Sequence, residues 1–205
     1  MIVPPGATIE VDGRAAAGAR PVYVMLNKPR GLVTTSSDEH GRDTIFTCFA
    51  GASLPRLFAT GRLDKASEGL IMLTNDSAWA ARINDPSMQL DNTYHVQVDV
   101  VADADLLRRL LDGAVSDNEM LRAKAAQIIR TGEKNSWVEI VLNEGHNRHI
   151  RRMLEALDIS VLRLIRISIG SLQLGSLGKG HWRHLNPGEV KAFSGASPER
   201  VNPGR

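Results

Sequence analysis

The sequence predicts an α+β fold with a mixed, mostly antiparallel central sheet flanked by helices. Short apolar runs rich in β-branched residues indicate strands, and amphipathic segments between them indicate helices. The two types do not alternate strictly, as they would in a parallel α/β fold. With 205 residues, of which 42% are hydrophobic and 23% charged, the chain can bury a full core as one domain or as two small lobes.

Six runs have the length and composition of strands. They span residues 22–26, 32–35, 57–60, 93–101, 137–142 and 161–169. The clearest is the run 93–101, in which Tyr94, Val96, Val98 and Val100 alternate with polar residues and therefore point to one side. An apolar run at 71–73 indicates a further, buried strand.

Helices are predicted at residues 43–49, 77–84, 103–112 and 188–193. Asn75 or Asp76 can cap the second of these helices, which Asp85-Pro86 ends. The third has an apolar leucine stripe and is closed by Gly113. Residues 170–180, rich in glycine and leucine, predict a hairpin.

Composition excludes several classes of protein. The single cysteine, Cys48, rules out an intramolecular disulfide and offers no metal cluster. Cofactor-binding motifs are missing as well, and no cofactor is expected. No apolar run reaches membrane-spanning length and the N-terminus lacks a signal pattern, so we expect a cytoplasmic protein that does not act at a membrane. The net charge of +2 is too small to indicate a nucleic-acid partner by itself.

The stretch 61–73 places a carboxylate where it can do chemistry. Asp64 lies between Gly61 and Gly69, beside Arg62, and just before the apolar run. Glycines permit a tight, presented loop, and an ionised carboxylate on such a loop can act as a nucleophile or base. A turn in which the aspartate only caps backbone amides fits the same residues, so local chemistry leaves both interpretations open.

Two motifs carry a resemblance to a known family. Residues 61–76 resemble the catalytic-aspartate motif of the RsuA-type pseudouridine synthases, which isomerise uridine in ribosomal RNA, and residues 144–153 resemble a second motif of that family. The resemblance implies the pseudouridine synthase catalytic fold, with two lobes and an active-site cleft. It also implies that Asp64 is the essential residue.

The implied reaction breaks the N1–C1′ bond of a uridine, rotates the uracil and rejoins it through C5. It requires no redox change and no metal. Whether Asp64 attacks C1′, adds to C6 or abstracts a ribose proton stays open. The target base must leave its stack, so the site needs a stacking surface and an electrostatic grip on a flipped nucleotide.

The resemblance also names partners for Asp64. Tyr94 is the candidate stacking surface, although Asn92 replaces the lysine that precedes the tyrosine in the family pattern. Arg151 matches the basic residue that forms a salt bridge with the catalytic aspartate, and Arg148 and Arg152 are expected nearer the RNA backbone. His149 stands where the family usually has glutamine, and we expect it to keep a hydrogen bond.

Helical spacing supports a basic surface in the second motif. Ile150, Met153 and Leu154 form part of an apolar stripe, which leaves the three arginines on the opposite face. Further candidate RNA contacts are Arg62, Lys28 and Arg30 in the turn 27–31, and Arg163 and Arg166 in the strand 161–169. Solvated turn charges are an equal alternative for Lys28 and Arg30.

Three segments are predicted along the chain. Residues 1–20 resemble the closing hairpin of an S4 RNA-binding domain followed by a linker, residues 21–193 form the catalytic domain, and residues 194–205 form a disordered tail. The rest of an S4 domain is not seen, and truncation, a late start and natural loss all stay open.

Two other functions compete with a synthase. One is a non-catalytic RNA-binding or ribosome-assembly module of the same fold, which would be indicated by loss of Asp64, Tyr94 or Arg151; all three are present. The other is a glycoside-type hydrolase, which needs paired carboxylates, and only Glu68 lies near Asp64 in the motif. We therefore predict a monomeric synthase acting on a ribosomal RNA stem-loop, with large-subunit RNA favoured.

Overall fold

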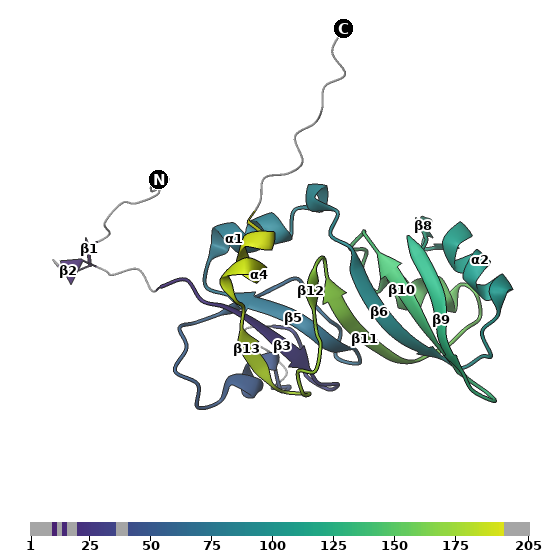
Figure 1. Cartoon of the computed structure of the whole chain (residues 1–205), viewed down its shortest axis with the longest axis horizontal. Helices are drawn as coiled ribbons and strands as arrows, with labels where there is room; N and C mark the ends of the chain where they lie inside the picture. The colour runs from purple at the N-terminus through teal and green to yellow at the C-terminus, as the bar shows by residue number, and fades with distance from the viewer. Residues whose placement is uncertain (1–9, 12–13, 16–19, 36–40, 195–205) are drawn as a thin grey trace, which may run out of the picture.

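The computed structural model describes residues 10–11, 14–15, 20–35 and 41–194, which are built around one nine-stranded mixed sheet (Figure 1). Its strands are β3 (Tyr23–Lys28), β4 (Phe58–Thr60), β5 (Glu68–Thr74), β6 (Asn92–Val98), β9 (Ala125–Thr131), β10 (Ser136–Leu142), β11 (Val161–Ile169), β12 (Leu172–Gln173) and β13 (Trp182–His184). The strands lie in the order β13-β3-β5-β11-β6-β10-β9, with β4 paired to β5 and β12 to β11. Two small hairpins stand apart, β1 (Glu10–Val11) with β2 (Arg14–Ala15) and β7 (Ala114–Ser116) with β8 (Glu119–Leu121).

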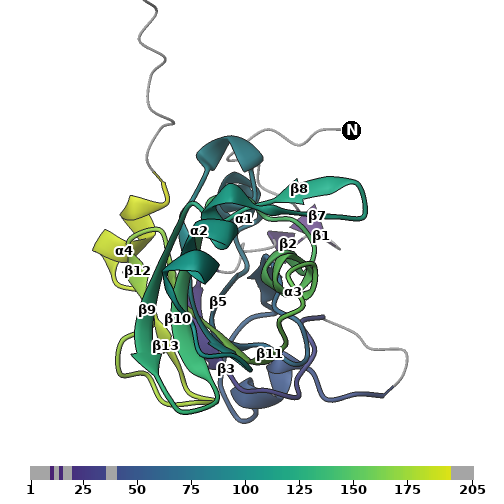
Figure 2. The same ribbon diagram turned by 90° about the vertical axis from the view of Figure 1, so that its right-hand side faces the viewer.

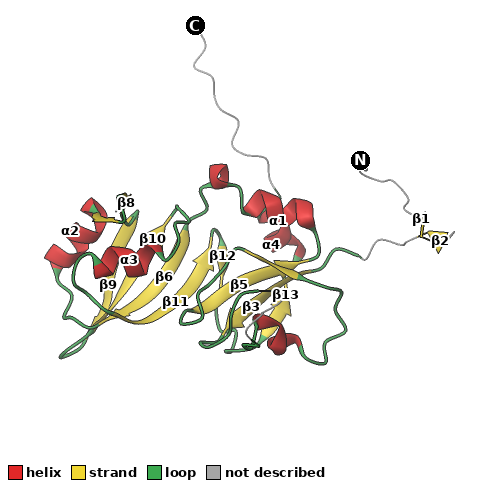
Figure 3. Ribbon diagram, turned by 180° about the vertical axis from the view of Figure 1, so that it is seen from behind, coloured by secondary structure: helices red, strands yellow, loops and turns green. Residues whose placement is uncertain are grey.

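Helices cover both ends of the sheet. They are α1 (Ser77–Ile83), α2 (Ala104–Asp112), α3 (His149–Glu155), α4 (Pro187–Ala192) and the 3-10 helices η1 (Ile45–Phe49) and η2 (Pro86–Met88). Asp76 and Asp103 accept hydrogen bonds from backbone amides at the starts of α1 and α2, as N-caps do. Figure 3 shows α2 and α3 over one end of the sheet and α1 with α4 over the other.

A single parallel pairing joins the two halves of the sheet. Strand β11 runs parallel to β5, with Ile165 opposite Glu68 and Arg166 opposite Gly69. Every other strand pair of this sheet is antiparallel in the described part of the chain. Each half has its own core, so the molecule consists of two lobes that share one sheet.

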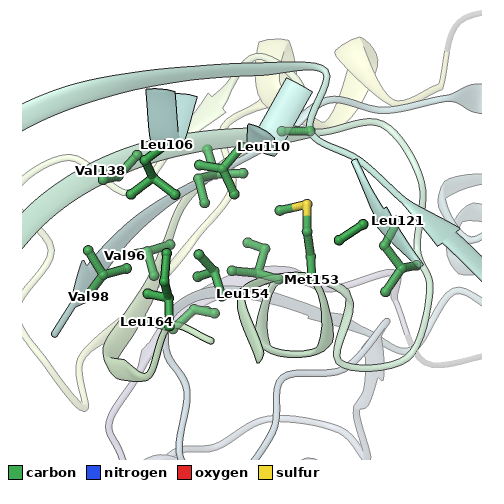
Figure 4. Close-up of a cluster of buried hydrophobic side chains, with 14 of the residues drawn as sticks. Val96, Val98, Leu106, Leu110, Leu121, Val138, Met153, Leu154 and Leu164 are labelled. Atoms are coloured by element: carbon green, nitrogen blue, oxygen red, sulfur yellow. The ribbon is translucent and has the colours of Figure 1, made fainter. Parts of the chain in front are cut away.

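The core of the β6–β11 lobe lies under α2 and α3. Apolar residues of one sheet face, including Val96, Val98, Val138 and Leu164, meet Leu106 and Leu110 of α2 and Met153 and Leu154 of α3 (Figure 4). The period-2 pattern of the strands and the stripe of each helix explain this packing directly.

Strand β5 is the centre of the other lobe, and all seven of its residues are buried. Leu70 and Met72 face a core formed with Trp79 of α1 and Phe193, while Ile71 and Leu73 face a second core with Ile45 of η1. A strand covered on both faces has a continuous apolar run rather than an alternating one, as its sequence shows.

Most predicted elements are confirmed with small shifts at their ends, and the mixed sheet is confirmed. The strand predicted at 32–35 is wrong, because Val33 makes only an isolated parallel bridge with Thr44. The helix predicted at 43–49 is a shorter 3-10 helix. Strands β7, β8, β9 and β13 were not predicted. The predicted tail falls mostly on residues 195–205, which lie outside the described residues, as do most of residues 1–20.

A buried ion-pair network fastens β5 to β11. The Glu68 side chain is only 3% exposed, and its oxygens lie 2.6 Å from Arg163 Nε and 2.6 Å from Lys179 Nζ. Hydrogen bonding by Arg163 lowers the pKa of Glu68 to about 2, against the opposing effect of burial. The network therefore stabilises the fold only while Glu68 is ionised.

Replacing Glu68 with glutamine should cost about 3 kcal/mol of unfolding free energy at neutral pH. A carboxylate whose pKa is depressed in the fold contributes fully above its unfolded pKa, and that contribution disappears as the pH falls through the folded value. Urea unfolding should therefore give a wild-type advantage that is constant near neutrality and shrinks between about pH 4.5 and about pH 2. A pH-independent difference would show that the charge of Glu68 is not what stabilises the junction.

Candidate active site

A cleft of about 640 Å³ opens where the two lobes meet. Its walls are formed by residues 60–64 before β5, residues 83–92 between α1 and β6, and residues 142–151 at the end of β10 and the start of α3. Leu164, Arg166 and Ile169 of β11 also line it. The cleft thus combines segments from both lobes around the parallel strand pair.

The loop that carries Asp64 is fixed through its backbone. The Thr34 hydroxyl donates to the Leu63 carbonyl at 2.8 Å, and the Gly31 amide donates to the Lys65 carbonyl at 2.8 Å. Ser67 N donates to Asp64 O at 3.0 Å, closing the turn. These contacts leave the Asp64 side chain free to enter the cleft, where it lines the wall and is 39% exposed.

Lys28 lies beneath this loop and does not reach the surface, so its predicted RNA contact is wrong. Its side chain is fully buried, and Nζ donates to the carbonyls of Pro29, Asp64 and Ser67 at 2.8–3.2 Å. Burial lowers the pKa of Lys28 to about 8. The three carbonyls explain why the ammonium is retained inside the protein: it holds the Asp64 loop from below.

Two arginines approach the Asp64 carboxylate from α3. Asp64 Oδ2 lies 3.6 Å from Arg148 Nη1 and 4.0 Å from Arg151 Nε. Arg151 is the more enclosed of the two and also donates to the Ala66 carbonyl at 3.3 Å. Burial and the neighbouring charge of Arg148 lower the pKa of Arg151, while Asp64 raises it. The structure therefore brings Asp64 and Arg151 together, as the sequence predicted.

Arg148 has an unusual backbone. It occupies the N-cap position of α3 with φ +51°, in the left-handed region that residues other than glycine seldom adopt. This conformation directs Arg148 toward Asp64 rather than along the helix face. Non-glycine residues held there are frequent at functional sites.

Three of the other predicted residues line the cleft, whereas Arg163 and Arg30 do not. Tyr94 and Arg62 line it, and so does Arg166. Arg163 does not line it, because it belongs to the opposite face of β11, where it pairs with Glu68 and lies 5.8 Å from the Trp137 ring. Its predicted RNA contact is replaced by this structural pairing. Arg30 is exposed next to the loop of Asp64.

Arg152 also has a different role from the one predicted. Its guanidinium donates to Glu119 Oε2 at 2.7 Å and to the Ser116 carbonyl at 2.7 Å, and so holds the β7–β8 hairpin beside α3 (Figure 2). The side chain is only 16% exposed. Since its donors are committed to the hairpin, Arg152 is turned away from the RNA backbone position expected for it.

Arg152→Ala should therefore destabilise the fold by about 1–2 kcal/mol and leave the salt dependence of RNA binding unchanged. Arg148→Ala is the matched comparison, because Arg148 faces the cleft, and it should reduce the slope of log K against log[salt] by about one contact. Urea unfolding and filter binding over a salt series would measure both. A reduced slope for Arg152→Ala would instead indicate that Arg152 contacts an RNA phosphate.

His149 does not keep the predicted hydrogen bond. The ring is 4% exposed, neither nitrogen has a partner within hydrogen-bond geometry among the described residues, and burial lowers the pKa of His149. It therefore lines the cleft as a buried ring. The segment 83–92, with Asn84, Asp85 and Gln89, was not predicted to line the cleft; the Asp85-Pro86 stop signal was the one hint that the chain turns here.

Comparison with solved structures defines the class of fold. The chain superposes on a protein described as a crystal structure of pseudouridylate synthase with a TM-score of 0.73 and 30% identity, covering 84% of this chain and 74% of the other. An archaeal box H/ACA complex of Nop10 and Cbf5 gives a TM-score of 0.53 at 14% identity, which shows a shared fold only. The fold is thus that of the pseudouridine synthases.

The chain belongs to the RNA pseudouridylate synthase family, whose model matches residues 22–156. It is 34% identical over 186 residues to ribosomal large subunit pseudouridine synthase B of Bacillus subtilis, covering 89% of this chain and 75% of that protein. It is also 34% identical over 177 residues to ribosomal large subunit pseudouridine synthase E of Xanthomonas campestris, covering 79% of this chain and 94% of that protein. The predicted RsuA-type branch is confirmed, and with it an isomerase that acts on RNA. Among the described residues, no helix has the length and apolarity to cross a membrane.

Proposed function

We propose that this protein converts one uridine of large-subunit ribosomal RNA into pseudouridine, with Asp64 as the essential carboxylate. The observation that carries the proposal is the placement of Asp64 Oδ2 within 4.0 Å of both Arg148 and Arg151 inside the cleft. Two relatives that are 34% identical are named for large-subunit ribosomal RNA, which favours that substrate.

The side chains around Asp64 have proposed roles. Arg151 orients the carboxylate, because it is fixed at the same time to the Ala66 carbonyl. Tyr94 offers an aromatic face to the flipped uracil from near the start of β6. Arg148, Arg62 and Arg30 are exposed cations around Asp64 and suit the phosphates that flank the target nucleotide.

The rest of the proposal concerns the surroundings of the enzyme. We propose that residues 1–20 end an S4-type RNA-binding domain and linker, that residues 21–193 are the catalytic domain, and that residues 194–205 form a tail. The substrate is a stem-loop from which the uridine flips. The enzyme acts as a monomer in the cytoplasm, where ribosomal RNA is processed.

Tritium release from ribosomal RNA labelled at C5 of uridine tests the function, because rejoining through C5 expels that hydrogen. Wild-type protein should release tritium from protein-free large-subunit RNA, and mapping should find a single modified position. Release only from small-subunit RNA would refute the choice of substrate. No release from any ribosomal RNA, with tight RNA binding retained, would favour the non-catalytic module.

A further inference from the structure

Unsatisfied buried polar atoms gather in one place in this protein. Within the described part of the chain, four buried side-chain nitrogens have no hydrogen-bond partner: Nδ1 and Nε2 of His149, Nε of Arg151 and Nη2 of Arg166. All three residues line the cleft. Buried polar groups are nearly always paired, so a cluster of exceptions in a cleft indicates donors kept for a ligand.

Arg166 is the most enclosed charged group of this set. Its side chain leaves β11 on the cleft face, is 6% exposed, and is fixed by a 2.8 Å hydrogen bond from Nε to the Leu70 carbonyl. Its backbone lies opposite Tyr94 on one side and Gly69 on the other. The guanidinium is therefore held rigidly in the wall that also carries the candidate stacking tyrosine.

No acidic side chain of the described residues forms an ion pair with Arg166 within 4.0 Å, unlike the other arginine of the same strand. Arg163 is neutralised by Glu68 on the opposite face of the sheet. A buried cation without an anion is costly for folding and is retained only where it has another use. The obvious use is an anion that arrives with the substrate.

Resting on the proposed function, we propose that Arg166 is a catalytic residue that binds a carbonyl oxygen of the uracil and stabilises the uracil anion while it is detached from ribose. When the Asp64 carboxylate attacks C1′, an O–C1′ bond forms, the N1–C1′ bond breaks, and its electron pair leaves on N1. The negative charge spreads to O2 and O4. After rotation C5 attacks C1′, Asp64 is released, C5 loses its proton and N1 takes one up.

The arrangement of Arg166 suits that step. A donor with no partner in the free enzyme can bind the oxygen without first breaking a protein contact, so its interaction strengthens as charge develops. Abstraction of a ribose proton by Asp64 would send the same electron pair to N1, so the role of Arg166 does not depend on which of these routes operates.

The test uses Arg166→Met, which keeps an unbranched side chain like the stem of arginine and removes the guanidinium, on RNA carrying uridine or 5-fluorouridine at the mapped site. Fluorine makes the uracil a better leaving group, so it needs less stabilisation. Loss of the starting nucleoside is measured under single-turnover conditions after nuclease digestion, by liquid chromatography coupled to mass spectrometry. The retention time separates the isomers of equal mass, and the readout does not depend on loss of the C5 substituent. We expect a loss of roughly a hundredfold or more with uridine and a much smaller loss with 5-fluorouridine.

Stability and affinity separate this role from others. Removing an unpaired buried charge should leave the melting temperature unchanged or raised, and the affinity for RNA should be close to that of wild type. Arg166→Lys keeps a charge but loses the planar pair of donors, so its rate with uridine should lie between those of Arg166→Met and wild type. Arg183→Met is the control, because Arg183 of β13 pairs with Glu189 of α4 and lies outside the cleft lining, and it should leave both rates unchanged.

Four results would overturn the proposal while leaving the proposed function in place. An equal loss of rate with both substrates would contradict stabilisation of the leaving uracil. Weaker RNA affinity with an unchanged rate at saturation would make Arg166 a phosphate contact. A lower melting temperature with a matching loss of activity would give Arg166 a structural role. If wild type converts uridine and Arg166→Met does so equally fast, only this inference fails. If wild type converts neither nucleoside, the proposed function fails with it.

Discussion

Replacing Asp64 with asparagine should abolish isomerisation, with a loss on the order of 10⁴-fold or more, as for other essential nucleophiles or bases. The amide has nearly the same shape as the carboxylate but can neither attack C1′ nor accept a ribose proton. Tritium release from labelled ribosomal RNA under single-turnover conditions measures the loss directly.

The fold should tolerate this change. The Asp64 loop is held through backbone atoms, by Thr34, Gly31 and Lys28, and the side chain itself is 39% exposed. Melting temperature and RNA affinity should therefore stay near those of wild type. Asp103→Asn is the matched control, because asparagine caps helices as well as aspartate and Asp103 caps α2 away from the cleft.

A different result would redirect attention to the other acids of the cleft. Asp85 and Glu144 also line it, but Asp85 accepts from the Ser87 amide and Glu144 contacts His146. Neither has an arginine within ion-pair distance among the described residues. If Asp64→Asn kept most of the wild-type rate, these two carboxylates would be the next to replace.

The sequence predicts well what local periodicity and contiguous motifs determine. The alternation at 93–101 predicts β6, with Tyr94 on the face that lines the cleft. The all-apolar run after Glu68 predicts the central buried strand β5. The two motifs also bring Asp64 and Arg151 together, although they are far apart in the chain. A resemblance can supply that pairing, whereas spacing alone cannot.

Sequence reasoning fails where a side chain's partners come from distant backbone. The turn containing Lys28 looks like a solvated surface turn, yet three carbonyls from two separate segments bury its ammonium. Helical arithmetic put Arg148 and Arg152 on one basic face. However, α3 begins at His149, so Arg148 does not follow the helical direction, and Arg152 meets a hairpin that was not predicted.

That hairpin shows why residues 114–131 were missed. Strands β7 and β8 have three residues each, too short for alternation to be recognised, and their turn residues Asp117 and Asn118 are the only strong local signal. Strand β9 is an edge strand with mostly exposed side chains. Its pairing with β10 therefore determines its position more than its own composition.

Gly69→Ala should have the largest effect on folding. Gly69 has φ +103°, and a Cβ at this position would lie 2.2 Å from the carbonyl oxygen of Arg166 and 2.7 Å from its amide nitrogen. Both atoms are backbone atoms of β11, so no side-chain rotation can relieve the clash. Among the described residues, the only strand pairing between the two halves of the sheet runs through this point. We expect a loss of about 4 kcal/mol or more in unfolding free energy, or no folded protein at 37 °C.

Gly175→Ala separates the clash from backbone strain. Gly175 has φ +57°, and a Cβ there would meet nothing within 4 Å, so this variant should lose only about 1–2 kcal/mol. Urea unfolding of both variants gives the comparison. Any folded Gly69→Ala protein should also be a poor enzyme, because separating β5 from β11 moves the Asp64 loop away from Arg166. Equal losses of unfolding free energy for the two variants would mean that β5 and β11 can separate at no energetic cost. The shared sheet could then not be what holds the two walls of the cleft in register.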